Sequence, residues 1–437
     1  MTLVDRSAPG VRIGWLRDER AAQAEPIDLA GRIIGVTFED SERRADKLSL
    51  QLDNFDLSLF EREQLAGGSI LEVSWGYPGH MAPPRRVVVR SMKGFQTLTI
   101  EAQALSTLMN RQAHTRTWLG VTRSQVARAI AEEHGYEGAF VDIDDTEEVF
   151  DTIAQTGETD ARFLRRLAAR EELEFYVDDG GLHFHERRLN AAPTHVFTWY
   201  ADPGRGDLMS VDVESDLVRR AGRVTVRSRD PVERTTIEES ATNESTERST
   251  LADILAIIDP ESGAETGRQA RNATSTVRPS TASTPAQARR EARARFVRAE
   301  RATVKLALKV VGDPTLHAKS IVEVRGISAL LSGPYYVTDA KHVISGGSYV
   351  CELKATRDGT GRRARALAQE RRGTSTPEAP PGAADEEREH GGERNQSERT
   401  SRYEHVRFDR VDPETGREVG EFRPRGEIGD GDPEGRR

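Results

Sequence analysis

The sequence predicts an α+β, β-rich protein whose strands fall into two modules separated by helices. Short runs rich in β-branched and aromatic residues recur between residues 28 and 120 and again between residues 303 and 353. Polar or glycine-bearing breaks separate these runs, and several short strands at regular spacing are typical of a β-barrel or a β-sandwich. Helical patterns lie between the two modules, and a charged segment poor in apolar residues follows the second.

The first module is expected within residues 1–120. Its strand-like runs are Val36–Phe38, Lys47–Leu52, Ile70–Trp75, Arg86–Val89 and Leu98–Ala102. Breaks such as Gly67-Gly68 and Tyr77-Pro-Gly79 separate them, which favours short antiparallel strands over long helices.

Residues 121–207 predict a region of two helices and a hairpin. Thr122 and Gln125 have the spacing of a capping box, and Gly135 is placed to end the helix of residues 122–135. Thr159 is the expected N-cap of a second helix, over residues 160–172. The apolar stripe of that helix consists of Phe163, Leu164, Leu167 and Ala168. Alternating residues on either side of the turn 178–181 predict a β-hairpin.

The remaining chain is divided by composition. Alternation at residues 208–232 predicts strands that return to the first module, and residues 233–285 predict a Ser/Thr-rich linker or insert around one short helix at 251–258. Thr284-Pro285 begins a third helix, which runs to about Arg301. Residues 286–357 form the second module, where Val304, Leu306, Leu308 and Val310 alternate with period two.

Residues 358–437 predict a disordered, charged tail, because so few apolar residues cannot offset the entropy of ordering the chain. Within it, residues 403–410 and 417–423 flank Asp412-Pro-Glu-Thr-Gly416 and could pair as a hairpin on a partner.

Composition excludes several classes of function. Of the 437 residues, 36% are hydrophobic and 31% are charged, which indicates a folded body diluted by polar segments. The net charge of −9 provides no overall attraction to nucleic acid or anionic lipid. The sequence has neither a signal peptide nor an apolar run of about 20 residues, so we expect synthesis in the cytoplasm and no membrane insertion.

Two groups of residues could hold a metal ion, but each has a simpler structural explanation. His183 and His185 lie two apart on one strand face, with His195 nearby in sequence, but a zinc site normally has three or four ligands. We therefore expect exposed hairpin histidines and no metal. The acidic run Asp142–Glu148 lacks the glycine and terminal glutamate of a calcium loop, so a solvated loop is expected.

No catalytic pattern is recognisable. Glu132-Glu-His134 lacks the rest of a zincin motif, and no Gly-x-Ser-x-Gly, P-loop or dinucleotide-binding motif occurs. Cys351, the single cysteine, lies in an alternating run and is expected to be buried and unreactive. The arginine-rich stretches 162–170 and 289–301 contain interleaved glutamates and lack stacking aromatics, which favours solvated helix faces or ion pairs between subunits over nucleic-acid binding. The sequence thus predicts no catalytic residue, no cofactor and no enzyme.

Two segments resemble the late control protein D family of contractile phages, which shares its fold with the hub part of VgrG proteins of type VI secretion. The first starts at Gln155-Thr-Gly-Glu-Thr-Asp, continues through Phe163-Leu-Arg-Arg-Leu-Ala168 and ends in the hairpin of residues 174–184. The second combines Gly312-Asp-Pro314 with Gly333-Pro-Tyr-Tyr-Val-Thr338 and His342. In order and spacing the resemblance spans about residues 25–357, and it leaves out the 233–285 insert and the tail.

The resemblance implies two similar tube-type β-barrels per subunit and a homotrimer that forms a pseudo-hexameric ring. Such a ring joins a six-fold inner tube to a three-fold central spike in the baseplate of a phage tail or injection particle, beside other baseplate proteins. Phe163, Leu164 and Leu167 would then be packing residues. The residues alone leave two other functions possible. One is a tail-associated cell-wall hydrolase. The other is a carbohydrate- or receptor-binding tail module, which would favour exposed aromatic clusters, although aromatics make up only 6% of the chain.

Overall fold

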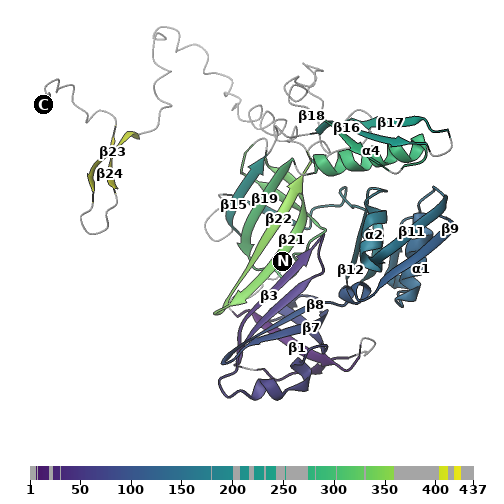
Figure 1. The fold of residues 1–437 in the computed structure, drawn as a ribbon. Coiled ribbons are helices and arrows are strands. Elements are labelled where there is room, and N and C mark those ends of the chain that lie inside the picture. Colours follow the sequence, from purple (N-terminus) through teal and green to yellow (C-terminus); the bar gives the residue numbers. More distant parts are fainter. Residues whose placement is uncertain are drawn as a thin grey trace, which may run out of the picture. The chain divides into compact units, whose positions relative to one another are not determined.

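The computed structural model of the chain (Figure 1) describes most of residues 6–358 and one hairpin beyond them. The described residues are 6, 8–18, 23–29, 31–178, 180–199, 207–215, 221–230, 233–242, 251, 274–280, 282–301, 303–328, 331–358, 403–411 and 418–424. Residues 1–372 form one compact unit and residues 373–437 a second.

One large sheet contains both predicted strand modules. Its first-module strands are β1 Gly10–Leu16, β2 Glu25–Pro26, β3 Ile33–Ser41, β4 Lys47–Asp53, β5 Ile70–Tyr77, β6 His80–Met81, β7 Arg85–Gly94 and β8 Thr97–Ala104. Its second-module strands are β19 Val304–Val311, β20 Ile321–Arg325, β21 Gly333–Ser345 and β22 Ser348–Arg357, and two strands from earlier in the chain, β14 His195–Thr198 and β15 Leu208–Ser215, pair with β20 and β19. The main path runs β15-β19-β22-β21-β3-β4-β8-β7-β5-β1-β2, and the described strands follow it as an open path.

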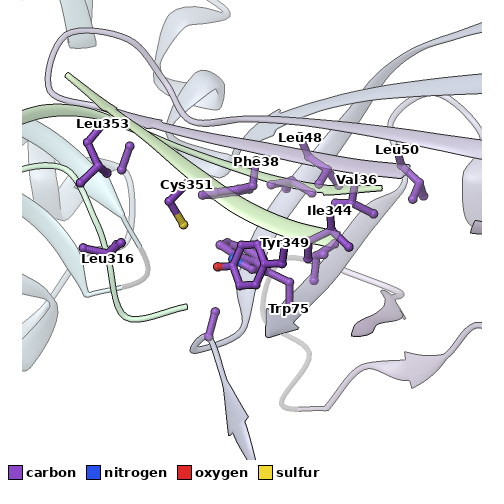
Figure 2. Packing of buried hydrophobic residues seen from close by; sticks show 14 of the residues in the cluster. Val36, Phe38, Leu48, Leu50, Trp75, Leu316, Ile344, Tyr349, Cys351 and Leu353 are labelled. Carbon is purple, nitrogen blue, oxygen red and sulfur yellow. The ribbon is translucent and has the colours of Figure 1, made fainter. Parts of the chain in front are cut away.

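The alternating sequence of the strands creates one core that both modules share. Leu48, Leu50 and Leu52 of β4 are fully buried while the residues between them are partly exposed, as expected for period-two side chains on a sheet with one buried face. The same core contains Leu353 of β22, and Figure 2 shows side chains from both modules packed together. Cys351 lies fully buried within it, as the sequence predicts.

The helix–hairpin module has a separate core. Its elements are β9 Ala113–Val121, α1 Arg123–Glu133, β10 Val141–Ile143, β11 Phe150–Thr159, α2 Asp160–Ala168, β12 Leu173–Asp178 and β13 Gly181–Glu186. Thr122 and Gln125 form the predicted capping box, and the Thr159 hydroxyl accepts from the Arg162 amide. Phe163, Leu164 and Leu167 are buried in this core, which confirms their packing role. Among the described residues, 3-10 turns occur in the first strand module, at η1 Ser58–Glu61 and η2 Glu63–Leu65, and at η3 Leu105–Asn110 and η4 Gly138–Phe140 around the helix–hairpin module.

The predictions for residues 208–285 need correction. The strand β15 pairs with β19 of the second module and not with the first module. Residues 221–229 form β16, which joins β17 Thr236–Ala241 and β18 Thr274–Pro279 in a separate sheet, so part of the predicted linker is regular structure. Helix α4, Pro285–Glu300, packs its apolar residues on this small sheet. Alternation predicted the strands β15 and β16 correctly and missed β17 and β18, and it carries no information about which distant strand is the partner.

The second unit contains one described feature, the antiparallel hairpin of β23 Tyr403–Val411 and β24 Glu418–Pro424. It occupies the position that the sequence predicts for a hairpin in the tail. The disorder expected for most of residues 358–437 and the short helix expected at 251–258 fall almost entirely outside the described residues. The exceptions, Asp358 and Leu251, are both buried.

Within the part of the chain that the structure describes, no helix has both the length and the apolar character needed to cross a membrane.

Candidate functional site at the junction of the modules

The two strand modules are joined by a continuous ladder between β3 and β21. The register runs from Gly35 opposite Ser345 to Ser41 opposite Asp339. Backbone hydrogen bonds along such a ladder fix both the distance and the direction of the two strands. The first and second modules therefore share a hydrogen-bonded seam as well as a core, and they form one body.

A buried ionic cluster at the end of β3 connects this body to the helix–hairpin module. We define it as Glu42, Glu174, Arg187 and Arg301. The Glu42 carboxylate accepts from Arg187 Nη2 at 2.5 Å and pairs with Arg301 Nη1 at 3.3 Å. Arg187 Nε lies 3.4 Å from Glu174 Oε2, which also accepts from the Tyr336 hydroxyl at 2.8 Å. The cluster thus links residues beside β3, β12, β13, β21 and α4.

Burial and charge act against each other in this ionic cluster. Burial alone would raise the pKa of the Glu42 carboxyl, but Arg187 and Arg301 hold that pKa below its usual range. Burial, together with the charge of Arg187, lowers the pKa of Arg301 to about 10. Two carboxylates and two guanidiniums balance, so the four groups can remain charged in a buried place. Loss of one partner would leave an uncompensated charge, which is strongly destabilising.

A second buried group of charges lies on the same side of β3. Lys319 Nζ donates to Asp40 Oδ1 at 2.6 Å and lies 4.8 Å from the centre of the Tyr176 ring. Although burial opposes the charged form, Asp40 and Asp46 raise the pKa of Lys319. Burial and the charge of Asp40 raise the pKa of Asp46 to about 7. This group links three parts of the chain: β3, β12, and the segment that precedes β20. Both strand modules and the helix–hairpin module therefore meet around it.

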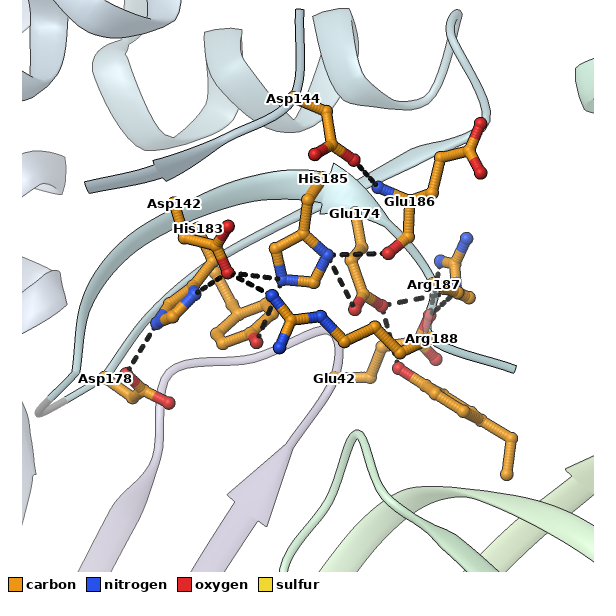
Figure 3. Close-up of polar contacts among 12 residues, drawn as sticks. Glu42, Asp142, Asp144, Glu174, Asp178, His183, His185, Glu186, Arg187 and Arg188 are labelled. Atoms are coloured by element: carbon orange, nitrogen blue, oxygen red, sulfur yellow. Dashed lines mark hydrogen bonds and ion pairs between the residues drawn. The ribbon is translucent and has the colours of Figure 1, made fainter. Parts of the chain in front are cut away.

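The histidines of the hairpin lie beside these clusters but differ from the prediction. His185 is buried, with 3% of its surface exposed, and His183 is partly buried, so the expectation of exposed hairpin histidines is wrong. The parallel strand β10 packs against β13 and brings Asp142 opposite His183. Figure 3 shows both imidazoles directed at the Asp142 carboxylate. His195 is elsewhere and bonds with the hydroxyls of Thr194 and Thr315.

Residues of the two other candidate motifs, 132–134 and 142–148, also form intrachain contacts. Glu133 pairs with Arg116 at 2.7 Å, and His134 Nε2 lies 2.9 Å from Asp160 Oδ2. Within the acidic run 142–148, Asp144 accepts from the Glu186 amide, so this run is not only a solvated loop.

The arginine-rich helices also form intrachain ion pairs. Arg166 pairs with Glu158, Arg289 with Glu239 at 3.2 Å, and Arg295 with Glu291 at 2.5 Å. The sequence predicts solvated faces or ion pairs between subunits here, whereas the observed pairs lie within the chain. Burial raises the pKa of the Cys351 thiol to about 12, as expected of an unreactive cysteine.

Sequence reasoning missed the residues that hold the modules together. Glu42 belongs to the polar segment Ser41–Asp46, which resembles any exposed turn between two strands. Arg187 and Arg301 follow a hairpin and a helix at positions where solvated arginines are common. Only their distant partners make them largely buried, with side chains 16% and 13% exposed, and sequence patterns do not record those partners.

Exposed aromatic side chains gather at the turns of the first module. Phe55, Phe60 and Phe95 expose 69%, 42% and 62% of their surface, and the rings of Phe60 and Phe95 lie 6.2 Å apart. We call these three residues the aromatic patch. Clustered exposed apolar residues are typical of protein interaction sites.

Comparison with known proteins gives a consistent result. A family model described as phage tail baseplate hub (GPD) matches residues 84–348. No curated protein matches the chain closely enough to count as a relative.

Among solved structures, the chain is similar to the tail protein from Neisseria meningitidis MC58. Their TM-score is 0.58 at 15% identity, over 82% of this chain and 99% of that one. A 43 kDa tail protein of prophage MuSo2 from Shewanella oneidensis gives a TM-score of 0.56 at 13% identity, over 81% and 100%. At these identities the likeness shows a shared fold.

Proposed function

Because the chain belongs to the phage tail baseplate hub family, we propose that it is a structural hub subunit that assembles as a homotrimer. The observation that carries this proposal is the β3–β21 ladder, which holds two strand modules in one body. In the proposed assembly each module is a tube-type β-barrel, so three subunits present six barrels. A ring of this kind matches a six-fold inner tube on one side and a three-fold spike on the other.

The role of such a ring is mechanical. It anchors the first ring of the inner tube and carries the central spike. It also remains part of the channel through which DNA or cargo passes when the tail contracts. The buried ionic cluster supports this role, since charge pairs with defined geometry resist sliding of the helix–hairpin module against the sheet. The subunit is made in the cytoplasm and incorporated into the baseplate of a phage tail or a related injection particle.

Light scattering on the purified chain tests this proposal. A monomer has a mass of 48.4 kDa, and a closed trimer would have three times that mass, about 145 kDa. The expected result is a trimer that electron microscopy shows as a ring, alone or with co-expressed spike protein. A chain that stays monomeric at all concentrations and with both spike and tube proteins contradicts the proposal.

The aromatic patch offers a test of partner contact. We propose that it contacts a neighbouring protein of the particle, because three large exposed aromatic side chains are costly to leave in water. Replacing Phe55 and Phe95 by serine is expected to abolish assembly with tube and spike while leaving the fold intact by circular dichroism. Exposed Val277 (53%) provides a matched control, Val277→Ser. Normal assembly of the double variant would refute the proposed contact.

The second unit is proposed to bind another baseplate or spike component through the β23–β24 hairpin. Its support is the paired backbone of this hairpin in a segment otherwise poor in apolar residues. Removal of residues 359–437 is expected to leave the trimer intact but to stop incorporation into particles. Particles of normal yield and composition would show that the tail has no such role.

A further inference from the structure

The helix–hairpin module brings together three potential metal ligands. β10 runs parallel to β13 with Asp142 opposite His183, and His185 lies two residues further along the same strand. Asp142 Oδ2 is 3.4 Å from His183 Nδ1 and 3.6 Å from His185 Nε2. One ligand atom from each of the three residues lies within 4.8 Å of the other two. We call these residues the His–Asp cluster.

Each imidazole has its outer nitrogen held by an acceptor. Asp178 Oδ1 lies 3.0 Å from His183 Nε2, and the backbone oxygen of Glu186 lies 2.6 Å from His185 Nδ1. Carbonyl oxygens only accept, so His185 Nδ1 is the donor of that bond, and Nε2 is the atom that faces Asp142, with the Tyr176 hydroxyl 3.3 Å from it. Metal-ligating histidines commonly have such an outer hydrogen bond to a carboxylate or a carbonyl, which orients the ring and increases its basicity.

The spacing suits a small divalent transition metal. Tetrahedral zinc with bonds of about 2.0–2.1 Å requires ligand atoms about 3.3–3.5 Å apart, and both contacts of Asp142 are near that range. Two imidazoles and one carboxylate favour zinc, cobalt or nickel over calcium and magnesium, which prefer oxygen ligands. The three ligand atoms lie within 4.8 Å of one another, so the two rings must move closer together to complete three positions, and a water molecule can take the fourth.

One charged side chain competes with a metal for Asp142. Arg188 Nη2 lies 2.6 Å from Asp142 Oδ2, the oxygen shared by both histidines (Figure 3). The Arg188 side chain is 68% exposed, so it can swing into water without leaving a buried charge unpaired. Displacing it costs little, because a solvent-exposed ion pair contributes little to stability.

We propose that Asp142, His183 and His185 form a site for a divalent transition metal that fastens β10 to the β12–β13 hairpin, with Asp178 as a positioning residue and Arg188 as its competitor. The inference concerns one module and does not depend on the hub role. The alternative is a metal-free cluster in which a protonated His183 bridges Asp142 and Asp178.

Cobalt titration of the full chain tests the proposal, because tetrahedral Co²⁺ has distinctive visible absorption. We expect one equivalent to bind, and His183→Gln and His185→Gln to abolish the visible bands. Asp178→Asn is expected to weaken binding about 10–100-fold, as loss of an outer hydrogen-bond partner does. Arg188→Gln is expected to tighten binding, because the competing cation is gone.

Two controls separate metal loss from misfolding. His195→Gln removes a histidine outside the cluster and is expected to bind cobalt like the wild type. Circular dichroism in the presence of a chelator establishes whether each variant is folded, and Arg188→Gln alters an exposed residue that the fold does not need. Absence of cobalt bands in both the wild type and Arg188→Gln overturns the proposal, as do bands that persist unchanged in a folded His183→Gln. Weaker binding in Arg188→Gln would equally contradict it.

Discussion

Replacing Glu42 by glutamine should destabilise the chain more than its single charge suggests. Glutamine keeps the shape of the side chain and one acceptor oxygen, so packing changes little. What it removes is the negative charge that Arg187 and Arg301 share. Glu174 then remains as the one carboxylate beside two guanidiniums, and the ionic cluster acquires a net positive charge in a place where the Glu42 side chain is only 5% exposed.

The magnitude follows from the distances. An attraction across the 3.3 Å between Glu42 and Arg301 amounts to about 5 kcal/mol at an effective dielectric constant of about 20. Part of this attraction is offset in the wild type by the cost of burying the charges. Breaking one partner out of a buried pair typically costs about 3–5 kcal/mol, because the remaining charge stays buried. We expect the free energy of unfolding to fall by that amount.

Urea denaturation followed by far-ultraviolet circular dichroism measures this change. The matched control is Glu214→Gln, whose partner Lys305 is 2.9 Å away but exposed, and an exposed pair contributes at most about 1 kcal/mol. Adding Arg301→Gln to Glu42→Gln restores neutrality and should recover part of the loss, a coupling that a double-mutant cycle reveals. If Glu42→Gln unfolds within about 1 kcal/mol of the wild type, the four charges do not act as a buried unit and the reasoning fails.

Three further changes address other parts of the fold. Burial lowers the pKa of His342 to about 4. The His342 imidazole therefore binds a proton more tightly in the unfolded chain than in the folded one. The stability that the neutral imidazole contributes is fully present above about pH 6.5, and the free energy of unfolding falls by about 2 kcal/mol between pH 7.5 and pH 5. His342→Gln should remove this component in urea titrations at both pH values, and equal pH slopes would contradict it. Phe163→Ala should lower the free energy of unfolding by about 3–5 kcal/mol, whereas Phe95→Ala, at an exposed site, should change it by no more than about 0.5 kcal/mol in the same assay. At Gly181, where φ is +113° and a Cβ would lie 2.1 Å from a carbonyl oxygen of η4, alanine should cost at least about 3 kcal/mol, against about 1 kcal/mol for Gly120→Ala in open space, and similar melting temperatures would contradict this.

The sequence was most informative where a local pattern decides the structure. Thr122 and Gln125 have the spacing of a capping box, and the period-two run of residues 304–310 can bury only one face, so both elements could be predicted without tertiary information. The strand that pairs with residues 208–215 could not be predicted, because the alternation of Val211 and Val213 is compatible with either module. Pairing is decided by register and core packing over long separations, and β19 lies about 90 residues further along the chain.

The candidate site was harder to predict for the same reason. Glu42 is buried by Arg187 and Arg301, which lie 145 and 259 residues away in sequence, and no local pattern distinguishes it from an exposed turn residue. The histidines of β13 showed their shared face through the spacing of two. Their third partner, Asp142, comes from a strand of only three residues, and its apposition to β13 appears only in the folded chain.

The ladder between β3 and β21 has a consequence for synthesis. Its two strands are separated by about 300 residues, so the ribosome releases β3 long before β21 exists. Until then one edge of β3 carries unpaired backbone groups, and such edges recruit other strands. Strand pairs with such a large sequence separation also form slowly, since the two distant segments must first be brought together. A truncated product that ends before residue 333 would therefore leave this edge open and tend to aggregate, so only complete chains would be available for incorporation into the proposed ring.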